Sequence, residues 1–385
     1  MSKERLVPKR RFKGFEEEWE TKSLLDIGNI VMGHSPKSIN YTSNPNDHIL
    51  VQGNADIKNH RIHPRLWTTE ITQTAKKGDI ILTVRAPVGE VAKTNYEVVL
   101  GRGVSAIEGN EYLFQYLLKL KANNYWGKLS SGSTFDSINS DDIKNLIINI
   151  PNIGEQQKIG RFFKLLDKRI SNQERKIAKL KDIKFAYLTE MFPQEGETVP
   201  KRRFKGFEGE WREVFLSEIT NIKMGHSPKS INYTNNSSDH VLVQGNADIK
   251  NNKIIPRLRT KEITQLAKEG EIILTVRAPV GEVAKTDFNV VLGRGVSAIE
   301  GNEFLFQYLL KLKANNYWKK LSTGSTFDSI NSEDIKNLII KLPCNKEQQK
   351  IGSFFKNLDN QIETEEKKLA KLKAMKEAYL EEMFV

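Results

Sequence analysis

The sequence predicts an α+β protein with two mixed α/β domains, separated by two long helices that form an antiparallel coiled coil with pseudo-two-fold symmetry. Three observations carry this prediction: the first half of the chain recurs in the second, each copy mixes strand and helix patterns, and each copy ends in an apolar heptad. With 385 residues, the chain is long enough for two domains that each bury a core.

A duplicated domain accounts for nearly the whole chain. VPKRRFKGFE begins at Val7 and again at Val199, and KLKANNYW begins at Lys119 and again at Lys311. The offset is 192 residues and holds without an insertion up to Phe192, far beyond the length of a solenoid repeat. Identity is higher in the mixed part than in the helical end. We therefore expect both mixed parts to do the same job.

The expected domain organisation follows the repeat. A first mixed domain covers residues 1–152, a long helix 153–192, a Pro- and Gly-containing linker 193–200, a second mixed domain 201–344, and a second long helix 345–385.

Local patterns predict the elements of the first copy in order. IILTVRAPVGEVA indicates two short strands around a turn at 87–89, and YEVVLGRGVSAIEG indicates a strand broken by Gly101 and Gly103. EYLFQYLLKLKANNYWGKL has the spacing of one amphipathic helix. Ser140 is the expected N-cap of a short helix, and IINIP is a strand that ends at Pro151.

After Pro151, apolar residues recur at alternating steps of four and three, with charged residues on the flanks. This heptad pattern is typical of a long helix that packs on a partner helix, although a helix packed on its own domain is the alternative. Lysines such as Lys176, Lys179 and Lys181 fit a solvated helix face, with partner docking as a second interpretation. The predicted seam residues are Ile159, Phe163, Leu166, Ile170, Ile177, Leu180, Ile351, Phe355, Leu358, Ile362, Leu369 and Leu372.

Composition restricts the class of protein. Apolar content of 38% and charged content of 28% indicate a soluble globular chain, and no apolar run predicts a membrane span or a signal peptide. The single cysteine, Cys344, suits a reducing cytoplasm, so we expect a cytoplasmic protein. The net charge of +12 favours a polyanionic partner.

Motifs of catalysis are missing from the sequence. It contains no phosphate-binding loop, no dinucleotide fingerprint and no Asn-Pro-Pro-aromatic tetrapeptide. The six histidines and one cysteine do not have metal-site spacing, and Glu90 and Lys93 are wrongly spaced for a nuclease. The sequence therefore predicts a non-catalytic binding protein with no metal and no cofactor of its own.

One ordered set of segments resembles a known family. GHSPKSINYT is followed by ILVQGNADI, GDIILTVRAPVGEVA, VVLGRGVSAI and GSTFDSINSDDIKNLIINIPNIGEQQKIGRFFKLLDKRI, and the set occurs twice. This order resembles the specificity (S) subunit of type I restriction-modification systems. The resemblance implies that each mixed domain is a target recognition domain that reads half of a split site in double-stranded DNA.

The resemblance also implies partners and their chemistry. The long helices dock methyltransferase (M) subunits, which we expect to number two per chain, and restriction (R) subunits can join. The assembled complex then has adenine-N6 DNA methyltransferase and ATP-dependent endonuclease activity. S-adenosylmethionine, ATP and Mg²⁺ are expected on the partner subunits, and no membrane partner is expected.

The near identity of the two domains departs from the usual family pattern of two dissimilar recognition domains. We therefore predict two identical half-sites in inverted orientation, a split palindrome. Two alternatives stay open: a coiled-coil scaffold that organises partners without reading sequence, and a self-contained methyltransferase or nuclease with unrecognised motifs. A scaffold predicts no sequence-dependent DNA affinity, whereas a specificity subunit predicts affinity and a steep salt dependence.

Residues that suit DNA contact occur in matched pairs. Arginines and lysines suit guanine edges and phosphates, and Gln52 and Asn54 have amides that can pair with adenine. Structural alternatives are that Asn54 caps a turn, that Arg85 forms a salt bridge across its hairpin, and that the Ser/Thr loop caps a helix. The predicted DNA-binding residues are Lys37, Ser38, Gln52, Asn54, Arg65, Arg85, Arg102, Ser133, Thr134, Lys229, Ser230, Gln244, Asn246, Arg257, Arg277, Arg294, Ser325 and Thr326.

Overall fold

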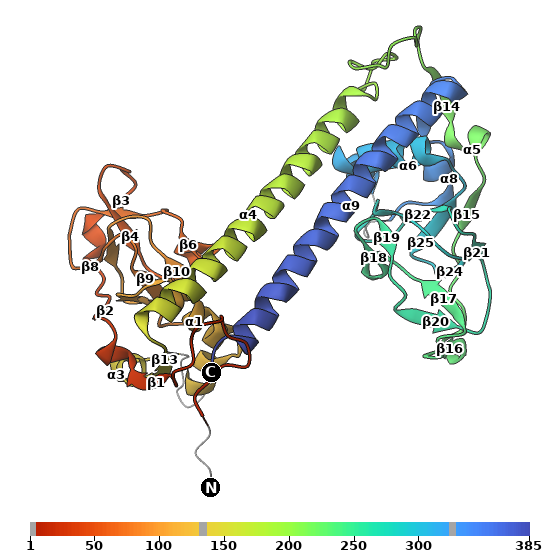
Figure 1. Ribbon diagram of the computed structural model, residues 1–385. Coiled ribbons are helices and arrows are strands. Elements are labelled where there is room, and N and C mark those ends of the chain that lie inside the picture. Colours follow the sequence, from red (N-terminus) through yellow and green to blue (C-terminus); the bar gives the residue numbers. More distant parts are fainter. Residues whose placement is uncertain (1–4, 131–136, 323–328) are drawn as a thin grey trace. The chain divides into compact units, whose positions relative to one another are not determined.

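The structure is a computed structural model that describes residues 5–130, 137–322 and 329–385 (Figure 1). The chain divides into two compact units. Unit 1 comprises Met1–Glu174 and Lys367–Val385, and unit 2 comprises Arg175–Glu366. Two long helices, α4 (Ile153–Glu190) and α9 (Asn345–Glu382), each contribute one part to unit 1 and the other part to unit 2.

The globular part of unit 1 contains short strands and helices. The strands are β1 (Glu20–Ser23), β2 (Ile30–Met32), β3 (Tyr41–Thr42), β4 (His48–Val51), β5 (Ile57–Lys58), β6 (Arg61–Ile62), β7 (Trp67–Thr68), β8 (Gln73–Ala75), β9 (Ile80–Thr83), β10 (Val91–Lys93), β11 (Val98–Leu100), β12 (Val104–Ile107) and β13 (Ile147–Ile150). The helices are η1 (Leu24–Asp26), η2 (Ser38–Asn40), η3 (Asn54–Asp56), α1 (Glu111–Ala122), α2 (Tyr125–Ser130) and α3 (Ser140–Lys144).

Unit 2 repeats this order. Its strands are β14 (Arg212–Phe215), β15 (Ile222–Met224), β16 (Tyr233–Thr234), β17 (His240–Val243), β18 (Ile249–Lys250), β19 (Lys253–Ile254), β20 (Leu258–Thr260), β21 (Leu266–Ala267), β22 (Ile272–Thr275), β23 (Val283–Lys285), β24 (Val290–Leu292), β25 (Val296–Ile299) and β26 (Ile339–Leu342). Its helices are α5 (Leu216–Ile219), η4 (Ser230–Asn232), η5 (Asn246–Asp248), α6 (Glu303–Ala314), α7 (Tyr317–Ser322) and α8 (Ser332–Lys336).

The strands of unit 1 form a six-stranded sheet of order β2-β12-β9-β10-β6-β5, a five-stranded sheet of order β3-β7-β4-β11-β8 and the pair β1-β13. The predicted hairpin is confirmed, because β9 and β10 pair antiparallel with Leu82 opposite Val91. The predicted break at the glycines is also confirmed, and it takes the chain from the five-stranded sheet at β11 to the six-stranded sheet at β12. Side chains are excluded there: a Cβ on Gly103 would lie 2.1 Å from the Gln52 carbonyl oxygen.

Two local predictions were wrong in detail. The expected single helix after Glu111 ends at Ala122 and restarts at Tyr125, because Asn124 has a φ of 52° that a continuous α-helix does not allow. The short helix is capped by Asn139 instead of Ser140. The Asn139 side chain accepts hydrogen bonds from the backbone N–H groups of Asp141 and Asp142, which satisfies two donors of the first turn.

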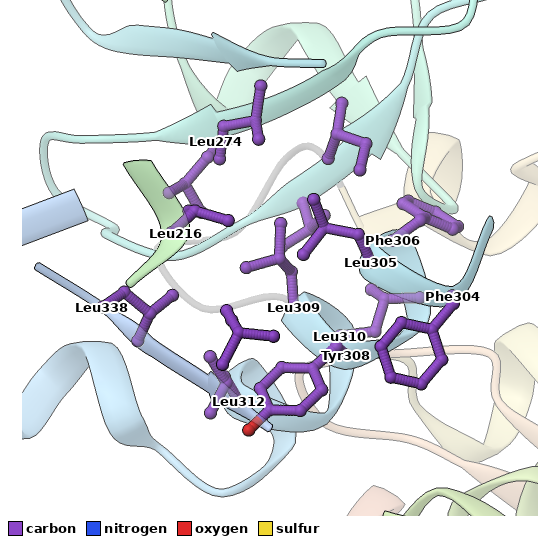
Figure 2. Packing of buried hydrophobic residues seen from close by; sticks show 14 of the residues in the cluster. Leu216, Leu274, Phe304, Leu305, Phe306, Tyr308, Leu309, Leu310, Leu312 and Leu338 are labelled. Carbon is purple, nitrogen blue, oxygen red and sulfur yellow. The ribbon is translucent and has the colours of Figure 1, made fainter. Parts of the chain in front are cut away.

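In each unit, one amphipathic helix packs on the six-stranded sheet and on the long helices. In unit 2, leucines of α6 such as Leu305 and Leu309 pack with Leu216, Leu274 and Leu338 (Figure 2). Helix α1 occupies the equivalent place in unit 1, where its buried face includes Leu113 and Leu117. Burial of this apolar stripe is the main force that holds helix and sheet together.

Within unit 1, the first part of α4 runs antiparallel to the last part of α9. Asp167 of α4 pairs with Lys376 at 2.6 Å, and Glu174, further along α4, pairs with Lys373 at 2.7 Å. The partner number falls as the α4 number rises, which is the signature of antiparallel helices.

Unit 2 shows the same arrangement in the other parts of the two helices. Lys181 pairs with Glu366 at 2.6 Å, and Lys184 pairs with Asp359 at 2.6 Å. Every predicted seam residue is buried or half-buried. The predicted α+β fold with long helices that pack together is therefore confirmed.

Each core is completed by a phenylalanine that follows the C-terminal end of a long helix. In unit 1, the Phe384 ring lies 5.1 Å from that of Tyr112 and 5.6 Å from that of Phe163. In unit 2, the Phe192 ring lies 5.3 Å from that of Phe304 and 5.5 Å from that of Tyr308. Within the described ranges, no helix combines the length and the apolar character that a bilayer crossing requires.

Candidate nucleic-acid interface

Four segments that lie far apart in the sequence of unit 1 line one open cavity, which has a volume of ≈ 660 Å³. The segments are 34–41, 52–54, 85–86 and 102–103, and they come from loops and short turns at the ends of strands. Six of the predicted DNA-binding residues are brought together here: Lys37, Ser38, Gln52, Asn54, Arg85 and Arg102.

Unit 2 has the equivalent cavity, with a volume of ≈ 480 Å³. Its lining includes the predicted residues Ser230, Gln244, Arg277 and Arg294. Lys229 and Asn246 are exposed and adjacent in sequence to lining residues, but they do not line the cavity themselves. Nearly the same constellation of side chains therefore occurs once in each unit.

Backbone hydrogen bonds hold the loop before Lys37 against the Gly-Arg-Gly segment. The His34 N–H donates to the Leu100 carbonyl at 2.9 Å, and the Arg102 N–H donates to the Ser35 hydroxyl at 3.0 Å. In unit 2, the Arg294 N–H donates to the Ser227 hydroxyl at 3.1 Å. These bonds place Arg102 and Arg294, both exposed, on the rim of their cavities.

The Gln52 side chain is oriented by a tyrosine. Its Nε2 donates to the Tyr41 hydroxyl at 2.8 Å, and its backbone N–H donates to the buried Asp56 carboxylate at 2.8 Å. In unit 2, Gln244 Nε2 donates to the Tyr233 hydroxyl at 2.6 Å. An amide held in one orientation presents a fixed donor and acceptor pattern, which is what the reading of a base edge requires.

A carboxylate that sequence reasoning missed anchors the lysine loop. Glu70 accepts hydrogen bonds from the Lys37 N–H at 2.8 Å and from Asn40 Nδ2 at 2.6 Å, and the backbone bond is the main cause that lowers the pKa of Glu70. Glu262 does the same for Lys229 and Asn232. The only signal in the sequence was that Glu-Ile-Thr recurs in both copies, which did not connect it with the lysine loop.

The hairpin places Arg85 on the cavity wall through its turn. The Thr83 hydroxyl donates to the Pro87 carbonyl at 2.8 Å and accepts from the Glu90 N–H at 2.9 Å. Among the described residues, the Arg85 side chain forms no ion pair, so the salt bridge considered for this hairpin is not observed there.

The acidic and basic residues of the hairpin have structural partners. Glu90 pairs with Lys121 at 2.5 Å and Lys93 pairs with Glu111 at 3.1 Å, so both side chains tie the hairpin to helix α1. They do not form a Glu-Lys pair with each other, which agrees with the interpretation of this segment as a structural hairpin.

The remaining predicted residues lie elsewhere. Arg65 donates to the Ala55 carbonyl at 3.0 Å, Arg257 lies 3.6 Å from the Asp248 carboxylate, and neither lines a cavity. Ser133, Thr134, Ser325 and Thr326 lie outside the described residues.

The chemistry of the lining is that of a contact surface for an anion with hydrogen-bonding groups. In unit 1 the lining contains Lys37, Arg85 and Arg102 and no carboxylate. Exposed cations suit phosphates and guanine edges, and an oriented glutamine suits a base edge. Within the described ranges, no three His, Cys, Asp or Glu side chains cluster so that they could hold a metal ion.

Known proteins resemble this chain over most of its length. The family described as "Type I restriction modification DNA specificity domain" matches residues 16–182 and 208–374. The type I restriction enzyme MjaIX specificity subunit of Methanocaldococcus jannaschii is 26% identical over an alignment of 406 positions that includes gaps and covers 94% of this chain and 92% of that protein. The putative MjaX specificity subunit of the same organism is 27% identical over 277 residues, but the match spans only 65% of its length.

Solved structures share the fold. A crystal structure of the S subunit of a type I restriction-modification system from M. genitalium has a TM-score of 0.66 at 18% identity, with 98% of this chain and 99% of that chain covered. A second chain, from a study of complex assembly and conformational transition of the type I R-M system, has a TM-score of 0.58 at 23% identity, with 97% and 99% covered.

Proposed function

This chain belongs to the type I restriction modification DNA specificity family, in which it is a specificity (S) subunit, the non-catalytic component of the enzyme. We propose that it reads a split palindrome in double-stranded DNA, two identical half-sites in inverted orientation, with one half-site for each unit.

The observation that carries the proposal is the match between the residues that line the two cavities. Every residue that lines the unit 2 cavity has the same residue type 192 positions earlier in the chain, and the orienting contacts of Gln52 and Gln244 are the same. Since base recognition depends on side-chain type and orientation, identical linings favour identical half-sites. In this proposal Arg85, Arg102 and Gln52 contact bases, and Lys37 contacts phosphate, as do their equivalents in unit 2.

The inverted orientation is supported by the helices. α4 and α9 are equivalent under the repeat, and in each unit they run antiparallel. Equivalent elements that run in opposite directions suit equivalent half-sites on opposite strands. In this organisation 1–152 and 201–344 recognise DNA, 193–200 links them, and 153–192 and 345–385 are the long helices.

The proposed partners follow from the family. We expect two methyltransferase subunits per chain and, in a complete system, restriction subunits, which supply adenine-N6 methylation and ATP-dependent cleavage with S-adenosylmethionine, ATP and Mg²⁺. The solved structure with TM-score 0.58 comes from a study of complex assembly and conformational transition of the type I R-M system. The alternative is a coiled-coil scaffold that organises partners without reading DNA sequence.

Methylome mapping tests the proposal directly. Cells that express this chain with its methyltransferase partner should carry methylated adenines in a single motif whose two halves are identical and inverted. Two unrelated half-sites would contradict the split palindrome while leaving the specificity function intact. Absence of any chain-dependent motif would favour the scaffold.

Matched variants test the cavities. Arg85→Ala and Arg277→Ala should each weaken binding of the mapped duplex by about tenfold, and by the same factor, since a good base contact is worth about 1–3 kcal/mol. Lys144→Gln and Lys336→Gln remove an equivalent charge from α3 and α8, outside the cavities, and serve as controls. Binding is measured by fluorescence anisotropy of the chain in complex with its methyltransferase subunits.

A further inference from the structure

One isoleucine in each unit points almost entirely into solvent. Ile39 and Ile231 are each 87% exposed, more than any other large apolar side chain among the described residues. Isolated exposed apolar residues are common on protein surfaces. The same extreme exposure at equivalent positions of both units, inside an identical ten-residue segment, is a stronger observation.

The turn that carries Ile39 is held in place on both sides. Ile39 is the middle residue of η2, and the Asn40 N–H donates to the Lys37 carbonyl at 2.9 Å across it. The Glu70 carboxylate binds the residues on either side of Ser38 and Ile39, through the Lys37 N–H and Asn40 Nδ2. These hydrogen bonds hold the turn in one conformation, in which the isoleucine side chain stays exposed to solvent.

The residues around Ile39 indicate the chemistry of the partner that contacts it. Lys37, Ser38 and Tyr41, which flank it in the sequence, all line the cationic cavity. The partner at this rim must therefore combine negative charge with a small apolar group. Among the groups on the edges of DNA bases, the C5-methyl of thymine in the major groove is the apolar one that side chains read.

We propose that Ile39 and Ile231 read a thymine C5-methyl group, one in each half-site, by apolar contact in the major groove. This inference rests on the proposed function. It adds a specificity-determining residue that sequence reasoning, which looked for polar and cationic side chains, did not select. Serine and lysine beside the isoleucine then hold phosphate and polar base atoms while the isoleucine excludes water from the methyl group.

Deoxyuridine, which lacks only the C5-methyl, gives the test. The full chain with its methyltransferase subunits is titrated with the mapped duplex and with duplexes that carry deoxyuridine in place of one thymine at a time. Each half-site contains a thymine, because methylation of adenine requires an A·T pair. We expect one position per half-site at which loss of the methyl weakens binding about three- to tenfold.

The double variant Ile39→Ala, Ile231→Ala should lose a similar factor on the thymine duplex and become insensitive to deoxyuridine at that position. Ile39→Val with Ile231→Val, which keeps a branched apolar side chain, should retain part of the sensitivity. Ile147→Ala with Ile339→Ala removes another repeated, exposed isoleucine pair, from β13 and β26, and should leave binding unchanged.

Several results overturn the inference and leave the proposed function intact. Wild-type binding that is insensitive to every deoxyuridine shows that no methyl is read. Equal sensitivity of wild type and double variant assigns the methyl to another residue. If the double variant binds the specific and the scrambled duplex more weakly by the same factor, the isoleucines contact DNA without reading its sequence. If the double variant loses its association with the methyltransferase subunits but keeps its DNA affinity, the isoleucines contact protein. Wild-type protein that does not distinguish the mapped site from scrambled DNA instead overturns the proposed function itself.

Discussion

In unit 1 the aromatic core is completed by Phe384, which follows α9, whereas in unit 2 the equivalent Phe192 continues directly into the linker 193–200. The two rings occupy equivalent places, but the margins of the two cores differ. The margin is the set of lysines and backbone carbonyls beside the closing phenylalanine. In unit 2, Lys311 donates to the Pro193 carbonyl at 2.6 Å, and Lys341 donates to the carbonyls of Gln194 and Glu197.

Unit 1 lacks the equivalent of Lys341 here, and the lysine charge that acts on Lys119 is that of Lys9. Lys119 donates to the Phe384 carbonyl at 3.3 Å, and the position equivalent to Lys341 is Asn149. The cavities show the opposite behaviour, since every residue that lines the unit 2 cavity has the same residue type in the lining of unit 1. The comparison teaches that the cavity lining keeps its residue types in both units, while the margin of each core is adapted to the chain that passes over it.

The largest expected effect comes from removing the closing aromatic residue. Phe192→Ala and Phe384→Ala should each reduce the free energy of unfolding by about 3–5 kcal/mol, because each ring is buried in an aromatic cluster and leaves a cavity. Hydrogen exchange should show Phe384→Ala weakening unit 1 alone and Phe192→Ala weakening unit 2 alone. Equal weakening of both units by either variant would show that the cores are not independent.

The next effect tests a feature that the units share. The buried Glu155 carboxylate accepts two hydrogen bonds from the Arg11 guanidinium, at 2.7 and 2.8 Å, and these bonds raise the pKa of Arg11. The Glu347 carboxylate binds Arg203 in the same way. Glu155→Ala and Glu347→Ala should each cost about 3 kcal/mol, because each leaves a largely buried guanidinium with no carboxylate partner and only backbone carbonyls as acceptors. Chemical denaturation measures the cost.

A matched control for this pair is Glu18→Ala, which removes the exposed partner of Arg5 and should cost less than about 0.5 kcal/mol. A cost at Glu155 as small as the cost at Glu18 would contradict the burial argument.

A third prediction concerns pH and the two margins. Burial, and then the Lys341 charge, lower the pKa of Lys311 to about 8, below its usual 10.5. A lysine with a lowered folded pKa is more easily deprotonated in the folded state. Its stabilising contribution is therefore complete above pH 10.5 and is lost as the pH falls through 8. The stability of unit 2 should thus rise between pH 8 and 10.5, by at most about 1.4 kcal/mol per pH unit from this group.

Exchange of the residues between the margins sharpens this test. Lys341→Asn should raise the pKa of Lys311 towards its ordinary value and flatten the pH dependence of unit 2. Asn149→Lys should lower the pKa of Lys119, which burial already lowers, still further. Denaturation midpoints and the NMR titration of the lysine side chains measure both effects. Unchanged titration of Lys311 in Lys341→Asn would contradict the electrostatic part of the explanation.

The smallest effect is expected between the long helices. Lys373→Ala removes an exposed ion pair with Glu174 in unit 1, and Lys181→Ala removes the pair with Glu366 in unit 2. Each should cost less than about 0.5 kcal/mol, because solvent screens exposed pairs. Thermal denaturation checks this, and a cost above about 1 kcal/mol would show that the pairs, and not the apolar seam, hold the helices together.

Much of the candidate site could be predicted because its residues recur. Polar and cationic side chains were selected for their hydrogen-bonding chemistry, and six of the selected residues share one cavity in unit 1. Arg65 was selected by the same reasoning but bonds to a backbone carbonyl outside the cavity, because side-chain type alone does not give direction. Tyr41 and Glu70 were missed because their role depends on contacts with residues 11 and 33 positions away.

The sequence by itself determined the duplication, the hairpin, the glycine break and the two long helices, because each depends on local periodicity or on steric demands of neighbouring residues. It did not place the helix break at Asn124 or the cap at Asn139, where competing residues of similar propensity stand side by side. Only the tertiary structure decided that each long helix serves both units, that Phe384 and Phe192 close the two cores, and that an isoleucine stands exposed beside each cavity. Those features depend on packing between residues distant in the chain, and no local pattern encodes which distant surface an apolar residue will meet.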